Sequence, residues 1–251
     1  MILLLAAALG YPATAKVALK TETRYYPTEI EARDVTLSKG ESVFKLELRP
    51  KRLLVLTQDV IATETGKTLL SAGTQLVPQT IIDGGVNYCT TRPARGNLWT
   101  GENMMCFTDK DGDLSFEEYF WTISALSSGV ATGYFVPDNI KKVLRVDAVE
   151  IPISEFDRNL TIQLDWVGGD GLRKPIQFRG SFCVDGRCDW ETRRFKAVGE
   201  RGQNISSFLS SAVSCNSTQA NRAVCQLTEN PRAEYIAIDV RGIDIVKGGA
   251  L

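Results

Sequence analysis

Short segments in which apolar and polar residues alternate recur along this chain, and they constrain its fold more than any other feature. The clearest is Leu160-Thr161-Ile162-Gln163-Leu164-Asp165-Trp166, and the same period of two continues at Ile176, Phe178 and Phe182 after the turn at 168–171. Successive side chains of a β-strand point to opposite faces of a sheet, so this pattern predicts half-buried strands. Further strands are predicted at 16–24, 43–48, 53–57, 143–149, 235–240 and 243–246, with a hairpin over 61–76. The expected fold is mainly β, with antiparallel sheets arranged as a sandwich or a barrel.

Composition limits the function classes that need to be considered. The chain has 251 residues, of which 43% are hydrophobic, and its formal net charge is -1. This content supports one folded region over 16–251, with an alternative subdivision into 16–88, 89–129 and 130–251. The charge balance gives no basic surface for nucleic acid. The count of His is 0, which excludes His-dependent triads, His general bases and His-ligated metals.

One segment is strongly acidic: Asp109-Lys110-Asp111-Gly112-Asp113-Leu114-Ser115-Phe116-Glu117-Glu118. Its first three carboxylates stand at alternate positions and two more follow shortly after. Ca²⁺ takes about six to eight oxygen ligands, and alternating Asp residues on a tight loop can direct several oxygens to one point. The segment therefore predicts a calcium site. The alternative is a solvated acidic turn without a metal, in which the carboxylates repel one another.

The same segment resembles the EF-hand calcium loop, D-x-[DN]-x-[DN]-G-x₅-E. Asp109, Asp111 and Asp113 match its first three ligand positions, Ser115 matches the ninth, and Glu118 matches the closing bidentate glutamate. The loop is shorter than the family pattern, because the family's glycine and the carbonyl ligand that follows it have no counterpart. Glu117 is an alternative closing ligand. The resemblance implies Ca²⁺ bound in preference to Mg²⁺, which demands near-octahedral geometry.

Two helices are predicted within the β fold. Ser115 and Glu118 form a capping-box pair, and Phe116, Tyr119/Phe120, Ile123 and Leu126 recur at helical spacing, so a helix is expected over 115–127. A second, short helix is expected over 203–213.

The six cysteines can be paired from the sequence. Asp185-Gly186 is typical of a two-residue type I′ turn, which places Cys183 opposite Cys188 on neighbouring strands. Cys215 and Cys225 enclose a polar loop and pair by elimination, which leaves Cys89 with Cys106. The alternative, zinc held by four thiolates, is disfavoured because the chain has no CxxC pair and no His.

The N-terminus predicts export. An apolar run from Ile2 to Leu9 precedes Ala13-Thr14-Ala15, a small-x-small cleavage pattern, so residues 1–15 are predicted to be a signal peptide. The alternative is an apolar first strand. An even number of cysteines agrees with an oxidising periplasmic or extracellular compartment. No later segment of the sequence is long and apolar enough to predict a membrane span.

Two function classes remain open at this point. The first is a non-enzymatic module in which calcium and disulfides stabilise a β scaffold that binds an unknown protein or a surface glycan. The second is a His-free hydrolase, for example a glycosidase, that uses a pair of carboxylates. Its candidate acids are Asp165, Asp170, Asp185, Asp189 and Glu191, and the sequence does not choose among them.

Overall fold

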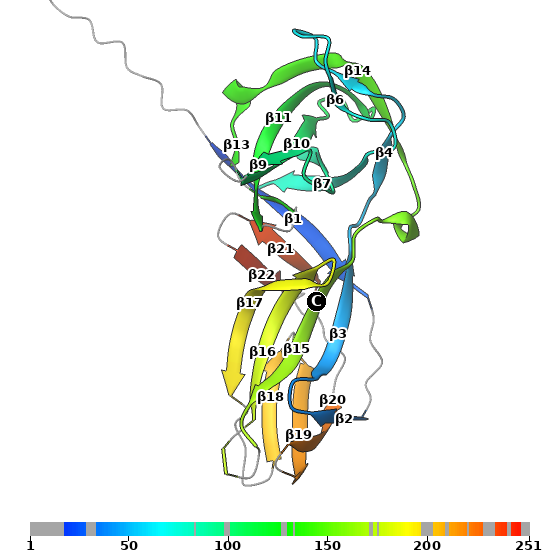
Figure 1. Ribbon diagram of the computed structural model, residues 1–251. Helices are drawn as coiled ribbons and strands as arrows, with labels where there is room; N and C mark the ends of the chain where they lie inside the picture. Colours follow the sequence, from blue (N-terminus) through cyan, green and yellow to red (C-terminus); the bar gives the residue numbers. More distant parts are fainter. Residues whose placement is uncertain are drawn as a thin grey trace, which may run out of the picture.

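The computed structural model describes most of the chain, and its architecture is shown in Figure 1. The described residues are 18–28, 34–82, 84–97, 101–126, 130–132, 134–170, 173–174, 176–196, 203–208, 211–219, 221–227, 234–239 and 242–246. The predicted signal peptide, 1–15, lies outside them. The prediction of a mainly β fold with antiparallel sheets is confirmed.

Six strands close into a barrel, which is the upper part of Figure 1. Around the ring they are β4 (Leu54–Leu56), β7 (Gln75–Ile81), β8 (Val86–Thr90), β10 (Gly101–Thr108), β11 (Ser115–Leu126) and β14 (Lys141–Glu150). All neighbours are antiparallel, and the β7–β8 and β4–β14 pairs complete the circle. Closure leaves the barrel strands without free edges. The interior is filled by a buried apolar cluster that includes Leu54, Leu76, Met105, Phe107 and Phe116.

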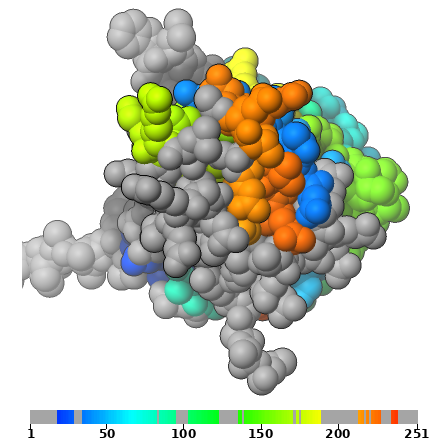
Figure 2. All heavy atoms as spheres, turned by 90° about the horizontal axis from the view of Figure 1, so that it is seen from below, coloured from blue at the N-terminus to red at the C-terminus, as the bar shows by residue number. Residues whose placement is uncertain are grey.

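A β-sandwich forms the lower part of Figure 1. One sheet contains β3 (Ser42–Arg49), β15 (Leu160–Gly168), β16 (Gln177–Val184) and β17 (Arg187–Lys196); the other contains β18 (Gln203–Phe208), β19 (Ser211–Gln219), β20 (Arg222–Leu227) and β2 (Asp34–Ser38). Figure 2 views this end from below, where the orange strands β19 and β20 lie beside β2 in blue. The core between the sheets contains Leu46, Ile162, Trp166 and Phe178 from the first and Val213 from the second. The even-numbered residues of the alternating segment 160–166 are therefore the ones that pack into the sandwich core.

One long strand, β1 (Leu19–Pro27), connects the barrel to the sandwich (Figure 1). It pairs with β7 of the barrel along 21–23 and with β3 of the sandwich at 26–27. It also pairs with β13 (Tyr134–Phe135) and β21 (Tyr235–Asp239), and β21 continues to β22 (Gly242–Val246). The remaining elements are β5 (Val60–Ile61), β6 (Thr68–Leu70), β9 (Arg95–Asn97), β12 (Val130–Thr132) and the 3₁₀ turns η1 (Pro137–Asn139) and η2 (Ile153–Glu155).

Both predicted helices are wrong. Residues 115–126 form β11, which pairs with β10 on one side and β14 on the other. Phe116 and Tyr119 still contact the same buried cluster, as a helix would arrange them. The register of the pairing with β14 shifts beside them: Phe116 lies opposite Val146 and Glu118 opposite Lys142, so the extra residues are on β14. Residues 203–208 form β18 and residues 211–213 begin β19, and the backbones of these two strands pair with each other.

The six cysteines form three disulfides: Cys89–Cys106, Cys183–Cys188 and Cys215–Cys225. These are the pairs expected from the sequence. Each joins neighbouring antiparallel strands, with a Cα–Cα distance of 4.0 Å. Asp185 and Gly186 have φ values of 49° and 82°, as a type I′ turn requires. Three disulfides fit an oxidising, exported environment.

Candidate metal site on the β10–β11 loop

The acidic segment is the tight connection between β10 and β11, so it lies at one end of the barrel and not at the start of a helix. Its fold is set by its own side chains. The Gly112 N–H donates to Asp109 Oδ1 at 2.8 Å, and the Ser115 N–H donates to Asp113 Oδ1 at 2.8 Å. Gly112 has φ 77°, a conformation that glycine adopts without steric cost. These bonds make the loop compact and direct the Asp side chains to one side of it.

Leu114 holds the loop against the barrel. It adopts φ 61°, which is uncommon for a residue with a Cβ, and its side chain packs on the barrel's interior cluster. Its carbonyl also accepts a hydrogen bond from the Ala148 N–H on β14, at 2.9 Å. The strained backbone is therefore supported by an apolar contact and by a bond to the neighbouring strand.

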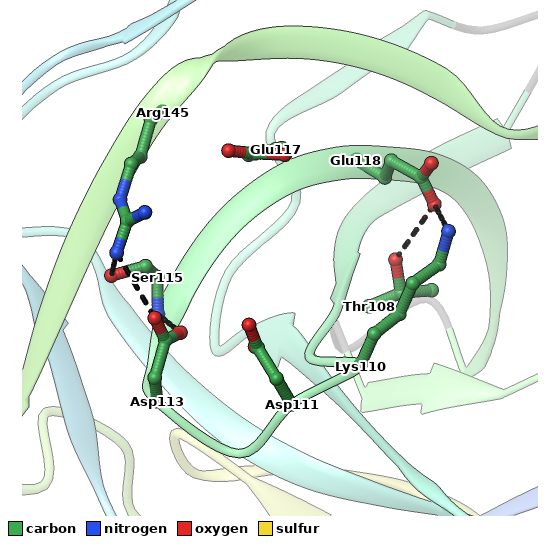
Figure 3. A pocket seen from close by; sticks show the side chains of 8 residues that line it. All are labelled: Thr108, Lys110, Asp111, Asp113, Ser115, Glu117, Glu118 and Arg145. Carbon is green, nitrogen blue, oxygen red and sulfur yellow. Dashed lines mark hydrogen bonds and ion pairs between the residues drawn. The ribbon is translucent and has the colours of Figure 1, made fainter.

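The structure brings Asp109, Asp111 and Asp113 together. One carboxylate oxygen from each residue lies within 4.8 Å of the other two. Ca²⁺ binds oxygen at about 2.3–2.6 Å, so two ligand atoms on opposite sides of one ion are separated by roughly 4.6–5.2 Å. Three oxygens at these separations can contact a single ion. Asp111 and Asp113 also line a pocket of about 140 Å³ (Figure 3).

Glu118, the predicted closing ligand, lies in the same pocket but outside the three-Asp group. Its Oε2 forms an ion pair with Lys110 Nζ at 2.8 Å and accepts a hydrogen bond from Thr108 Oγ1 at 3.4 Å. Glu117 also lines the pocket and is exposed. Figure 3 shows the Glu117 carboxylate on the opposite side of the pocket from Asp111.

Arg145 on β14 is the charged residue of this pocket that the sequence analysis did not find, and Thr108 is a further lining residue outside the acidic segment. The Arg145 guanidinium donates to Asp113 Oδ2 at 3.0 Å and to Ser115 Oγ at 2.9 Å, while Ser115 Oγ donates to Asp147 Oδ1 at 2.5 Å. The β11–β14 register, with Ser115 opposite Asp147, brings these residues together from positions 30 to 32 apart in the sequence. No spacing in the sequence indicated this contact. Only the knowledge that residue 115 pairs with residue 147 in neighbouring strands would have indicated it.

The pKa values resolved near the loop belong to a neighbouring pair. Arg52 donates to the Tyr88 hydroxyl at 3.0 Å and to Glu150 Oε2 at 2.9 Å. Burial raises the pKa of Tyr88, and the hydrogen bond to Glu150 raises the pKa of Arg52. The charge of Asp109 adds to both increases. Both side chains stay protonated at neutral pH, and the charge of Arg52 is paired with Glu150.

The acids proposed for a hydrolase have structural partners wherever their side chains are described. Asp165 is buried and accepts bonds from Ser42 Oγ at 2.6 Å and Gln163 Nε2 at 3.1 Å. Asp170 accepts two backbone N–H bonds within its own turn, and Asp185 forms an ion pair with Arg158 at 2.8 Å. The side chains of Asp189 and Glu191 lie outside the described part of the chain. The described geometry therefore offers no pair of free carboxylates among these candidates.

Comparison with protein-family models, with curated proteins and with solved structures finds no match for this chain. Among the described residues, no helix has the length and apolarity needed to cross a membrane.

Proposed function

We propose that this protein is an exported, non-enzymatic binding or structural module whose β10–β11 loop holds Ca²⁺ through Asp109, Asp111 and Asp113. The observation that carries the proposal is the approach of three carboxylate oxygens to within 4.8 Å of one another on a loop folded by its own hydrogen bonds. Carboxylate oxygens are ligands of hard cations, and a site open to solvent completes its coordination with water.

Among the described residues, the nearby cations pair with Glu118 and Asp113 and not with Asp111. Lys110 is paired with Glu118, and Arg145 contacts Asp113 through an oxygen that does not bond to the Ser115 N–H. Asp111 is left without a hydrogen bond from any described residue, so its carboxylate is available to a metal. Glu118 can add a ligand only if it leaves Lys110. A hydrolytic role has no comparable support, because a pocket of about 140 Å³ is small for a substrate.

The role proposed for the ion is to stabilise the folded barrel and not to switch its conformation. The loop connects two neighbouring barrel strands and is bonded to a third through Arg145 and Leu114. An ion held by three residues of the loop would stabilise the folded hairpin end, which Arg145 and Leu114 already bond to β14. Calcium should therefore raise the melting temperature and leave the far-ultraviolet circular dichroism spectrum unchanged.

Calorimetric titration of chelator-treated protein tests the proposal. We expect binding of one Ca²⁺ with selectivity over Mg²⁺. Asp109→Ala should weaken binding, whereas Lys110→Ala should not, because removal of Lys110 frees Glu118 and removes a repelling charge. Absence of heat up to millimolar calcium, or equal affinity for Mg²⁺, would reject the calcium site. A calcium-dependent change in secondary structure would reject the stabilising role alone.

An unidentified protein or surface glycan remains the proposed partner of the module. A pull-down with calcium or with chelator would determine whether such a partner depends on the loop.

A further inference from the structure

The turn between β16 and β17 is a second place, besides β1, where the sandwich is bonded to the barrel. Its residue Asp185 exchanges two hydrogen bonds with Asn159: the Asp185 N–H donates to the Asn159 carbonyl at 2.8 Å, and the Asn159 N–H donates to Asp185 Oδ1 at 3.0 Å. Asn159 ends the connection from β14 of the barrel to β15 of the sandwich, which runs down the side of the molecule in Figure 1. The turn is thereby fixed to the segment that connects the two parts.

Asp185 also holds two arginines that contact the barrel. Arg158 Nε lies 2.8 Å from Asp185 Oδ2, and the Arg158 side chain is only 6% exposed. Its guanidinium also donates to the carbonyl of Thr91, just after β8 of the barrel. Arg92 lies 3.8 Å from the same Asp185 oxygen and forms a closer ion pair with Asp157 at 2.8 Å. The turn thus supplies the carboxylate at the centre of a charged network between sandwich and barrel.

A second set of bonds lies beside this network. The Gln75 side chain on β7 donates to the Glu155 carbonyl at 2.7 Å and accepts from the Asp157 N–H at 3.0 Å. The connecting segment 155–159 is therefore bonded to the barrel on one side and to the Asp185 turn on the other. A buried arginine that loses its carboxylate partner is costly, so the position of Asp185 matters for the whole contact.

The disulfide that holds this turn differs from the other two in its exposure. Cys183 and Cys188 bracket Asp185-Gly186 with a sequence separation of 5; Cys188 is exposed, whereas Cys183 is 2% exposed, so the bond is open to attack only at Cys188. Cys89, Cys106, Cys215 and Cys225 are each at most 1% exposed. Thiol–disulfide exchange requires a thiolate to reach a sulfur atom along the S–S axis, so access decides which bond reacts.

We propose that Cys183–Cys188 is a site of thiol–disulfide exchange with an external dithiol, and that its reduction loosens the Asp185 contact between the sandwich and the barrel. A thiolate of the dithiol attacks Cys188 Sγ, the Cys183–Cys188 bond breaks, and Cys183 leaves as a thiolate that takes up a proton. The second thiol of the dithiol then attacks the mixed disulfide and releases Cys188 as a thiol. The dithiol leaves as a disulfide, having transferred two electrons to the protein.

The first test measures which bond reacts. The folded chain is treated with graded dithiothreitol, quenched by alkylation, and mapped by peptide mass spectrometry. We expect Cys183 and Cys188 to be alkylated at least tenfold faster than the other four cysteines. Simultaneous reduction of all three bonds, or earlier reduction of a buried pair, would overturn the proposal.

The second test measures the consequence of reduction by amide hydrogen exchange on the selectively reduced, alkylated protein. The reciprocal amides of Asn159 and Asp185 should exchange at least tenfold faster than in the oxidised protein. The Ala148 amide, which donates to Leu114 in the barrel, is the control and should keep its rate. The double variant Cys183→Ala/Cys188→Ala should show the same pattern without any reductant. Unchanged exchange at Asn159 and Asp185 in both samples would show that the disulfide does not hold the contact.

Discussion

The substitution Asp111→Asn should have opposite effects on stability with and without calcium, and this sign reversal is the strictest test of the metal site. Asp111 is suited to the test because its carboxylate accepts no hydrogen bond from the described residues, so Asn removes charge without breaking a bond of the loop. The pocket and its rim contain six carboxylates (Asp109, Asp111, Asp113, Glu117, Glu118 and Asp147) against the two cations Lys110 and Arg145. A carboxylate in this pocket is therefore surrounded mainly by charges of its own sign.

The magnitude follows from the distance between the carboxylates. Two unit charges 4.8 Å apart repel by about 0.9 kcal/mol in water, so Asp111 contributes about 1.7 kcal/mol of repulsion with its two neighbours. Screening at physiological ionic strength, where the Debye length is about 8 Å, reduces this to about 1 kcal/mol. In a chain of this length, 1 kcal/mol corresponds to about 2–4 °C in melting temperature. With chelator, Asp111→Asn should therefore melt about 2–4 °C above the wild type.

Calcium should reverse that order. At a hundredfold excess over Kd, bound calcium stabilises the wild type by about 2.7 kcal/mol. A variant whose affinity is a hundredfold weaker gains only about 0.4 kcal/mol at the same concentration. The assay is thermal unfolding of both proteins in chelator and in calcium. Glu117→Gln is the matched control, since it removes an exposed acid from the same pocket and should keep the calcium-induced increase. A calcium-induced increase of equal size in Asp111→Asn and the wild type would refute the assignment of Asp111 as a ligand.

Two further predictions concern the scaffold. Phe116→Ala should destabilise the protein by about 3–5 kcal/mol in urea unfolding, because Phe116 is fully buried with its ring centroid 5.0 Å from that of Phe107. The control Glu117→Ala should change stability by less than about 0.5 kcal/mol. Similar losses in the two variants would contradict the strand register. Burial raises the pKa of Tyr25, so its contribution to stability is complete below the unfolded pKa of 10.0 and is lost above it, by about 1.4 kcal/mol per pH unit. Tyr25→Phe should flatten the alkaline loss of stability measured from pH 8 to 11.5, and parallel curves would show that Tyr25 does not titrate as stated.

The β class and the cysteine pairs could be predicted because each depends on local patterns. Leu160–Trp166 alternates because one face of β15 meets the sandwich core, and Asp185-Gly186 fixes the register that places Cys183 near Cys188. The closing pairs of the barrel could not be predicted in the same way. The β4–β14 and β7–β8 contacts depend on which strand meets which, and alternation carries no information about partners.

The prediction of a helix after the acidic loop was wrong for a related reason. Phe116 and Tyr119 stand three apart, as on a helix face, and Ser115 with Glu118 fits a capping box. In the barrel, these residues lie on β11 beside a shift in its register with β14, and Phe116 and Tyr119 contact one buried cluster, while Ser115 bonds to Asp147 and Glu118 to Lys110. Pairing with two neighbouring strands outweighed local helical signals. The acidic loop was visible in the sequence, but its contact with Arg145 depended on that pairing. The subdivision at 88 and 130 stays a prediction, although β8, β10 and β11 belong to one barrel with β4, β7 and β14.

The β10–β11 loop and the Asp185 contact should act independently, although β14 leads from one to the other. Arg145 and Asp147 on β14 contact the loop, and the connection after Glu150 ends at Asn159. Hydrogen bonds within the loop orient Asp109 and Asp113 already, so calcium needs no movement of β14 to bind. We therefore expect calcium to slow amide exchange at Ser115 and Ala148, whose N–H groups bond within the loop and to Leu114. The amides of Asn159 and Asp185 should keep their rates. Calcium-dependent protection at Asn159 would show instead that β14 transmits binding to the contact between barrel and sandwich, and that the ion does more than stabilise one end of the barrel.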